Sequence, residues 1–391
     1  MISTPITADL IHGIAELEIT ERGVRPHRLP EWVRRQFPDA QLMAMESQPS
    51  GARLAVRTTA TTIELVTHAV RIAYQGADRP RGCIDVLVDG QLFLHDLLDG
   101  GDVIERDLQT GTATFRDGNS HTTTMTGLLP HEKLVEIWLP YNETLDLVSL
   151  HSDAPLAAHD AQAPVWMHHG SSISHGTNAA SPTEIWPVIA ARAAGVELHN
   201  LGFGGNSLID PFVARVIRDR PADMISVKLG INIVNIDAMR LRAFTPAVHG
   251  FLDTIRDGHP DTPLLLVSPI YSGIHETTPG PAAVDPASLG TEQVRFIATG
   301  DPADVAHGRL TLEVIRRELA GVVEQRADPN LYYLDGTTLY GETDAAVLPL
   351  PDALHPDNAT HHLIGQRFAE LVFANQMFAW SDACTRVDRG T

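Results

Sequence analysis

The sequence predicts an α/β protein of two domains, an N-terminal antiparallel β-sandwich of jelly-roll-like form followed by a parallel sheet flanked by helices. Through about residue 155, apolar and polar residues alternate with a period of two, as in half-buried strands. After an Ala- and Asp-rich stretch at 157–164, strand patterns and helix patterns alternate instead. A chain of 391 residues is also long for a single core. We therefore expect domains at residues 1–158 and 159–391.

Composition narrows the classes of partner. Lys and Arg total 29 against 49 Asp and Glu, a net charge of −20, which argues against a nucleic-acid partner because phosphate backbones are bound largely by basic side chains. We expect no membrane association, because no apolar run is long enough to cross a bilayer. The start of the sequence has no basic region followed by an apolar stretch, which predicts a cytoplasmic protein.

The two cysteines, Cys83 and Cys384, match neither a disulfide framework nor the spacing of a zinc site. We expect both to be thiols without a chemical role, and we expect no bound metal or cofactor.

The first domain begins with a short predicted helix at 29–37, anchored by Trp32 and Phe37, and continues as strands. Asp89-Gly90 lies between two of the strands and is typical of a hairpin turn. This domain contains no recognisable catalytic group of residues. The predicted strands are 53–58, 62–65, 84–88, 92–94, 134–139 and 145–148.

The second domain has five predicted strands, each followed by a loop and a helix pattern. Ser181-Pro182-Thr183-Glu184 has the pattern of a capping box, which predicts a helix that begins at Pro182. Ligand sites in such sheets gather at the carboxyl ends of the strands. The five strands are expected at 165–167, 196–201, 224–229, 264–267 and 331–334.

Four loops at that edge carry residues suited to acyl transfer. Ser172 follows the first strand in a Gly-x-Ser turn, where a nucleophilic hydroxyl is held beside free backbone N–H groups. The glycines of 202–205 follow the second strand and Asn232 follows the third. Asp352 stands three residues before His355 in a proline-bounded turn, where a carboxylate can orient the imidazole.

Each of these features has an ordinary structural explanation when taken alone. Glycine-rich segments form tight turns, an asparagine caps helices, and a single histidine is usually a surface or core residue. Unrelated turns would not be expected to supply a nucleophile, backbone donors, an amide and an Asp-x-x-His pair at one sheet edge. The conjunction therefore favours an active site.

In these four blocks the chain resembles the SGNH hydrolases, also called GDSL lipases and esterases. The first block corresponds to residues 170–176, the second-block glycine to Gly205, the third-block asparagine to Asn232, and the fifth block to Asp352 and His355. The resemblance spans about 165–373 and implies a flavodoxin-like domain with a five-stranded parallel sheet. Ser171 stands where the family usually has aspartate, and Ile233 stands where aspartate often follows the asparagine.

The resemblance implies a triad of Ser172, His355 and Asp352, with an oxyanion hole formed by the backbone N–H groups of Ser172 and Gly205 and the side chain of Asn232. A sandwich ahead of such a domain resembles a two-domain subgroup that includes carbohydrate esterases and an acyltransferase acting on an aromatic polyketide. We therefore expect small-molecule partners, an ester or thioester donor such as acyl-CoA and an alcohol acceptor.

Four questions stay open on the sequence alone. The acceptor would be a natural-product or sugar hydroxyl in an O-acyltransferase and water in an esterase. Residues 272–310, rich in Pro, Gly and Asp, form an insertion that is either a lid or a surface excursion or subunit contact. A binding protein on an inactivated fold is a further alternative, whereas a metal site at His168, His169 and His175 is disfavoured because adjacent strand residues face opposite sides. The oligomeric state is unknown.

Overall fold

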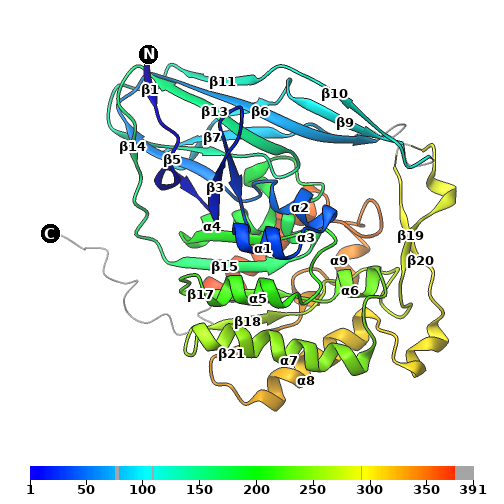
Figure 1. The fold of residues 1–391 in the computed structure, drawn as a ribbon. Coiled ribbons are helices and arrows are strands. Elements are labelled where there is room, and N and C mark those ends of the chain that lie inside the picture. Colours follow the sequence, from blue (N-terminus) through cyan, green and yellow to red (C-terminus); the bar gives the residue numbers. More distant parts are fainter. Residues whose placement is uncertain (75–78, 108–109, 292, 375–391) are drawn as a thin grey trace.

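The computed structural model describes residues 1–74, 79–107, 110–291 and 293–374, so the prediction for Cys384 lies outside the described residues. Figure 1 shows a β-rich N-terminal part, in blue to cyan, lying over one side of a parallel sheet with its helices. The predicted α/β fold class is confirmed. No described helix combines the length and apolar character needed to cross a membrane.

Two sheets face each other in the N-terminal part. Their inner faces share one core, in which Leu54 and Val86 of one sheet meet Leu65 and Leu147 of the other. The strands of the first sheet, as described, are β1 (Ile2–Thr4), β3 (Glu16–Ile19), β4 (Val24–His27), β6 (Thr62–Tyr74), β9 (Asp102–Arg106), β10 (Ala113–Arg116), β11 (His121–Thr126) and β13 (Thr144–Ser152). Those of the second are β2 (Ile11–His12), β5 (Arg53–Thr58), β7 (Cys83–Val88), β8 (Gln91–Leu97), β12 (Lys133–Trp138) and β14 (Ala157–Ala158).

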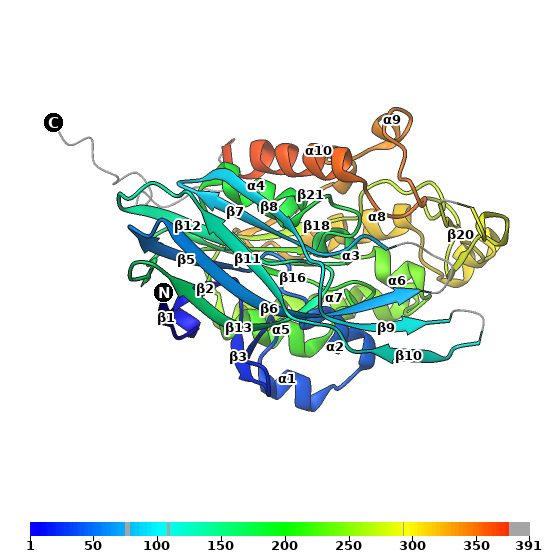
Figure 2. The same cartoon turned by 90° about the horizontal axis from the view of Figure 1, so that it is seen from above.

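The predicted hairpin is present as β7 and β8, and its turn residues Asp89 and Gly90 both have positive φ, as a tight primed turn requires. The sandwich departs from the prediction in one pairing, because β6 runs parallel to β9. β6 is much longer than predicted and extends past β13 to reach β9, and Figure 2 shows this length. Its second half lacks the strict alternation on which the prediction relied.

The parallel sheet has the predicted strands in the order β16-β15-β17-β18-β21, which is the flavodoxin-like order 2-1-3-4-5. Ser172 follows β15, at the point where the strand order reverses, and ligands bind at this point in open α/β sheets. The strands are β15 (Val165–Gly170), β16 (Glu197–Gly202), β17 (Met224–Lys228), β18 (Leu264–Val267) and β21 (Leu331–Leu334).

Helices cover both faces of this sheet. One face packs against α5 (Pro211–Arg218), α7 (Leu241–Gly258) and α8 (Leu312–Arg326), and the other against α4 (Trp186–Ala194) and α10 (Asn358–Phe368), which lie side by side in Figure 2. The remaining helices and turns are α3 (Ser172–His175), α6 (Ile231–Asn235), α9 (Glu342–Ala345), a π-helical turn at Ala369–Ala374 and 3₁₀ turns at Ala8–Leu10, Pro182–Glu184, Pro286–Ser288, Pro302–His307 and Gly336–Thr338.

The predicted capping box at 181–184 is wrong. Ser181 makes no cap hydrogen bond, and its hydroxyl donates instead to Asp85 of the sandwich. Only a 3₁₀ turn forms at 182–184, and α4 begins at Trp186. Pro187 explains the break, since a proline in the interior of a helix lacks an N–H and clashes with the carbonyl four residues earlier, so it is placed in the first turn.

The N-terminal chain also contributes to the core of the second domain. α1 (Glu31–Gln36) and α2 (Ala40–Glu46) place Val33 and Leu42 in the cluster beneath the parallel sheet. The predicted anchors of α1 are 38% and 44% exposed, so they do not enter that core. Trp32 lies under the guanidinium of Arg215, and Phe37 stacks on Phe212 at the surface of α5. The predicted boundary at 158/159 stays a prediction.

A buried arginine joins the two parts. Arg28 is fully buried, and its guanidinium lies 4.8 Å over the ring of Phe203. Burial lowers the pKa of Arg28 to about 9, partly offset by Glu46, so the side chain stays charged at neutral pH. Its hydrogen bonds go to groups on both sides of the joint, at 2.5–3.0 Å: the carbonyls of Met45, Gln48, Asn200 and Gly202, and Nδ1 of His175.

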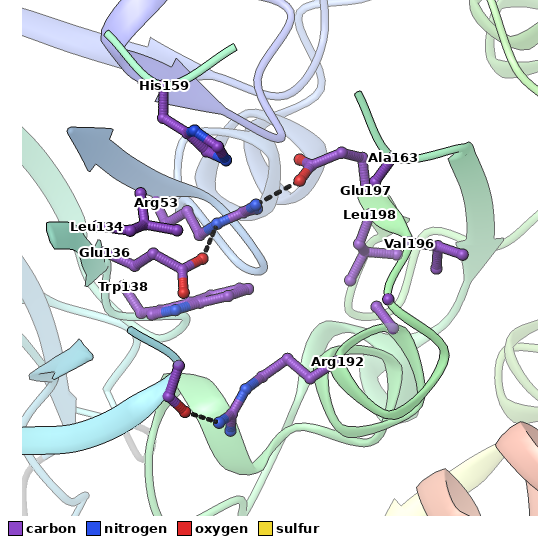
Figure 3. Close-up of a pocket in the computed structure, with 13 residues that line it drawn as sticks. Arg53, Leu134, Glu136, Trp138, His159, Ala163, Arg192, Val196, Glu197 and Leu198 are labelled. Carbon is purple, nitrogen blue, oxygen red and sulfur yellow. Dashed lines mark hydrogen bonds and ion pairs between the residues drawn. The ribbon is translucent and has the colours of Figure 1, made fainter. Parts of the chain in front are cut away.

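A cavity of about 320 Å³ lies at the same joint, near the start of β16. Figure 3 shows Arg53 crossing it to reach Glu136 and Glu197, both at 2.6 Å, with Trp138 below. Arg53 thus forms one ion pair with the sandwich, at Glu136, and another with the parallel sheet, at Glu197. Because this cavity is at the amino end of the strands, it is distinct from the edge that carries Ser172.

Arg28→Met is expected to lower the free energy of unfolding by at least about 3 kcal/mol, because the carbonyls that receive the guanidinium would remain buried without a donor. The free energy of unfolding is measured by urea titration followed by fluorescence. Arg116→Met, whose side chain is 64% exposed, is the matched control and should change stability by less than about 0.5 kcal/mol. Equal effects of the two substitutions would contradict the role given to Arg28.

Asp210, at the start of α5, should make stability fall with rising pH. Burial, with a contribution from Asp39, raises the pKa of Asp210 to about 6, well above its usual value of 3.8. The folded state therefore binds the Asp210 proton more tightly than the unfolded state does. This contribution to the free energy of unfolding is lost as the pH rises from about 4 to 6. Asp210→Asn is expected to stabilise the protein on the order of 2 kcal/mol at pH 8 and far less at pH 4. Stabilisation of equal size at both pH values would contradict this.

Candidate active site

Ser172 is the first residue of α3, directly after β15. Ser171 is the N-cap, and its hydroxyl accepts the N–H of Ile173 at 3.3 Å, a role that serine fills as well as aspartate. Serine in place of the family's usual aspartate at position 171 therefore preserves the N-cap of α3. α3 packs closely on β16 at Gly202. A Cβ at this position would lie 2.6 Å from the backbone N of His175, which is too close. Only glycine permits this approach.

Ser172, His355 and Asp352 are brought together although the serine and the histidine are 183 residues apart. Ser172 Oγ lies 2.9 Å from His355 Nε2, and His355 Nδ1 lies 2.7 Å from Asp352 Oδ2. The His355 and Asp352 side chains are only 12% and 16% exposed. With Nδ1 donating to the carboxylate, Nε2 presents its lone pair to the Ser172 hydroxyl, which donates to it.

The loop that carries this pair is held rigidly. Asp352 Oδ1 accepts the backbone N–H groups of Leu354 and His355 at 2.9 and 2.6 Å, and Ala353, between Asp352 and Leu354, has φ +69°. Burial raises the pKa of Asp352, but hydrogen bonds and charge from His355 outweigh it, so the net shift is downward. The carboxylate is therefore ionised at neutral pH and can stabilise a protonated imidazole.

Gly204 and Gly205 lie next to Ser172. A Cβ at Gly204 would be 3.7 Å from Cβ of Ser172, and Gly205 has φ +73°, which disfavours other residues. Within the described residues, no hydrogen bond occupies the backbone N–H of Ser172 or of Gly205. Both groups are therefore free to donate to a substrate.

Asn232 lies in α6 and is 2% exposed. Its Oδ1 accepts the backbone N–H of Ser207 at 3.0 Å, which ties it to the loop of Gly205 and fixes the orientation of the amide. Across the described ranges, Nδ2 has no hydrogen-bond partner in the protein. Its N–H groups are thus available to an oxyanion.

Two neighbouring histidines support the site from below. His168 bridges Ser174 of α3 and Ser226 of β17 at 2.8 and 2.7 Å, while His169 contacts the carbonyl of Leu201 on the opposite face. The expectation that they face opposite sides of the sheet is confirmed. Burial lowers the pKa of both side chains, to about 4 for His169, so each is neutral.

Sequence reasoning missed three side chains around the site. Gln41 of α2 donates from Nε2 to the carbonyl of Gly204 at 3.2 Å, and Met45 of the same helix lies against Gly204. Phe296, on the insertion, donates its N–H to the carbonyl of Asp352 at 2.9 Å and sets its ring edge-to-face against His355. No local pattern marks Gln41 or Met45, because their contacts arise from the packing of the two domains.

The insertion is anchored to the loop of Asp352 and His355. It contains the antiparallel pair β19 (Ala282–Val284) and β20 (Phe296–Ala298), and at its start Ser272 donates its hydroxyl to the carbonyl of Ala353 at 3.1 Å. Together with Phe296, this contact places the insertion at the edge of the candidate site.

Comparison with known proteins agrees with this geometry. Residues 164–277 match the GDSL-like lipase/acylhydrolase family, a range that includes Ser172, Gly205 and Asn232. A solved structure of a salicylyl-acyltransferase, SsfX3, from a tetracycline biosynthetic pathway is similar over 96% of this chain and 98% of that one, with 27% identity and a TM-score of 0.78. The family match and this structural likeness together support an SGNH/GDSL hydrolase assignment for the part of the chain that includes residues 164–277.

Carbohydrate esterases share the whole two-domain arrangement. A family two carbohydrate esterase from Clostridium thermocellum is 12% identical over 95% of this chain and 99% of that one, with a TM-score of 0.57. One from Cellvibrio japonicus is 13% identical over 97% and 98%, with a TM-score of 0.56. At this identity the likeness shows a common fold. No curated protein matches this chain significantly in sequence.

Asn232→Ala is expected to lower kcat by about 10²–10³, equivalent to roughly 2.7–4 kcal/mol, because an oxyanion would lose a preorganised donor. Asn232→Asp keeps the acceptor for the Ser207 N–H but replaces the donor with a negative charge, so its loss should be at least as large. Steady-state kinetics with an activated ester measures both. Activity of Asn232→Asp within about threefold of the unsubstituted protein would rule out this donor.

Proposed function

We propose that this protein is an O-acyltransferase that forms an acyl-enzyme on Ser172 and passes the acyl group to a hydroxyl of a natural product or sugar. The hydrogen-bonded series from Ser172 through His355 to Asp352 is the observation that supports it most directly. Its distances are those at which a general base activates a serine nucleophile.

In the first half of the reaction, Ser172 Oγ attacks the carbonyl carbon of an ester or thioester. His355 Nε2 accepts the hydroxyl proton, and Asp352 stabilises the imidazolium. The N–H groups of Ser172 and Gly205 and the Asn232 amide hold the oxyanion. When the tetrahedral intermediate collapses, the alkoxide or thiolate leaves with the proton from His355, and the acyl group stays on Ser172.

In the second half, the acceptor hydroxyl gives its proton to His355 and attacks the acyl-enzyme, which releases the new ester and restores Ser172. Water as acceptor would give hydrolysis, and this esterase is the second candidate because the carbohydrate esterases share the fold. Two observations favour transfer: the likeness to a salicylyl-acyltransferase, and the Phe296 ring against His355, which limits the approach of water to the base.

Ser172→Ala is expected to abolish labelling by a fluorophosphonate and to lower turnover of an activated ester by about 10⁴ or more. Ser171→Ala is the matched control, since it removes a cap worth about 1 kcal/mol but leaves the nucleophile. The Ser171→Ala variant should still be labelled by the fluorophosphonate. Undiminished turnover by Ser172→Ala would refute the proposed nucleophile.

Transfer and hydrolysis are separated by the products. With a thioester or activated ester donor and increasing alcohol or sugar acceptor, the transferase should form the new ester at the expense of free acid, as measured by mass spectrometry. Phe296→Ala, which opens the base to solvent, should shift the ratio towards free acid. Rapid hydrolysis with no ester product from any acceptor would establish the esterase instead.

A further inference from the structure

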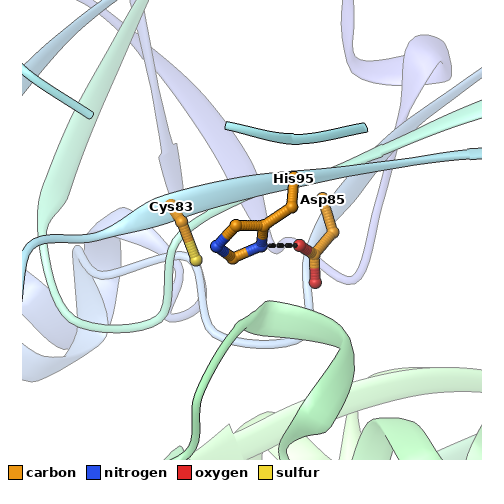
Figure 4. A group of neighbouring side chains, drawn as sticks. All are labelled: Cys83, Asp85 and His95. Atoms are coloured by element: carbon orange, nitrogen blue, oxygen red, sulfur yellow. Dashed lines mark hydrogen bonds and ion pairs between the residues drawn. The ribbon is translucent and has the colours of Figure 1, made fainter. Parts of the chain in front are cut away.

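Cys83, Asp85 and His95 form a cluster outside the candidate active site, and Figure 4 shows the imidazole between the thiol and the carboxylate. One potential ligand atom from each residue lies within 4.8 Å of the other two. His95 Nδ1 is 2.8 Å from Asp85 Oδ1. The Cys83 sulfur has one weak polar contact, 3.9 Å from the carbonyl oxygen of Ala180.

The three side chains are fixed by the strand pairing. Cys83 and Asp85 alternate on β7 and so share one face, and His95 on β8 is the direct cross-strand partner of Asp85. Leu87, next in the alternation, packs in the core with α4 and α10, so this face of the sandwich lies against the second domain. A site built on two paired strands needs little ordering before it binds a ligand.

Asp85 retains partners that hold it in place. Its Oδ2 accepts the Ser181 hydroxyl and both the N–H and the hydroxyl of Thr183, at 2.5–3.1 Å, while among the described residues Oδ1 has only His95 as partner. Cys83 and Asp85 are 4% and 1% exposed, but the side chain of His95 is 49% exposed. An ion can therefore enter from the His95 side without opening the core.

The cluster is not arranged as a second nucleophile. Cys83 is buried, and the carboxylates of Asp85, Glu143 and Asp96 contribute negative charge around its thiol. A reactive cysteine needs positive surroundings that stabilise its thiolate. Negative surroundings have the opposite effect and favour a bound cation, which would itself displace the thiol proton.

We propose that Cys83, Asp85 and His95 bind one Zn²⁺ ion, with the thiolate, the imidazole and Asp85 Oδ1 as ligands and water in the fourth position. Thiolate and imidazole together favour zinc over Mg²⁺ or Ca²⁺, which prefer oxygen. Zinc bonds of about 2.0–2.3 Å place ligand atoms about 3.5 Å apart. The ligand atoms that lie up to 4.8 Å apart must therefore approach one another, whereas His95 Nδ1 and Asp85 Oδ1, now 2.8 Å apart, must separate. Movement of the half-exposed His95 side chain can supply both changes. The thiol proton leaves to solvent.

Such an ion would reinforce the joint beside the active site. Ala180 contacts Cys83, Ser181 and Thr183 are bound by Asp85, and these residues follow α3, which carries Ser172. The ion has no part in the acyl transfer proposed above. Its effect is expected on the stability of the contact between sandwich and second domain.

Equilibrium dialysis of the tag-free protein against Zn²⁺, and titration with Co²⁺ as a spectroscopic probe, test the proposal. One Zn²⁺ per chain should be retained, and Co²⁺ should give the near-ultraviolet thiolate-to-cobalt charge-transfer band. Cys83→Ser and His95→Gln should each weaken Zn²⁺ binding by at least about tenfold and abolish or alter this band. Zn²⁺ should raise the unfolding temperature of the unsubstituted protein but not of Cys83→Ser.

Cys384→Ser and His307→Gln are the matched controls, since they remove the other cysteine and an exposed histidine, and both should bind as the unsubstituted protein does. Unfolding temperatures measured with a chelator show that the variants fold. Absence of retained zinc, a cobalt spectrum without the thiolate band, or unweakened binding by both Cys83→Ser and His95→Gln would overturn the proposal.

Discussion

The buried guanidinium of Arg28 is the interaction on which the assembly of this site depends. It is held by carbonyls at the end of α2 and at the end of β16, and it also reaches His175 of α3. The elements beside Ser172 therefore converge on one buried charge. A buried charge is tolerated only when its hydrogen bonds are satisfied, so the two domains must dock in one relative position. The sandwich in this way helps to position the candidate active site.

Local hydrogen bonds and close packing hold the candidate catalytic side chains in place. Ser171 caps α3, Gly202 lets that helix lie against β16, and Asp352 binds the backbone of its own loop before it binds the imidazole. Each of these contacts fixes a side chain in a loop at the carboxyl edge of the sheet. Because the strands run parallel, the loops that follow them lie at one edge, and residues 183 positions apart meet at hydrogen-bonding distance. Preorganisation of this kind is what an oxyanion site requires.

Much of this architecture was predictable from the sequence. Period-two alternation located six of the fourteen described strands of the sandwich, and strand-helix alternation located every described strand of the parallel sheet. The four blocks placed Ser172, Gly205, Asn232 and Asp352 with His355 in the loops that the structure brings together. The misses have physical causes. The capping box failed because Pro187 starts the helix later, and β6 was cut short because alternation fades along it. Arg28, Gln41 and Phe296 act only through tertiary contacts, which no local pattern encodes.

The proposed acyl transfer requires a covalent acyl group on Ser172, and trapping this intermediate is the most direct test of the mechanism. The protein would be mixed with a slowly reacting acyl donor, quenched in acid, and analysed by intact mass and peptide mapping. The predicted result is one acyl group per chain on the peptide that contains Ser172, discharged when an alcohol acceptor is added before the quench. An adduct on another residue, or steady turnover with no adduct in the burst phase or at steady state for any donor, would contradict the account.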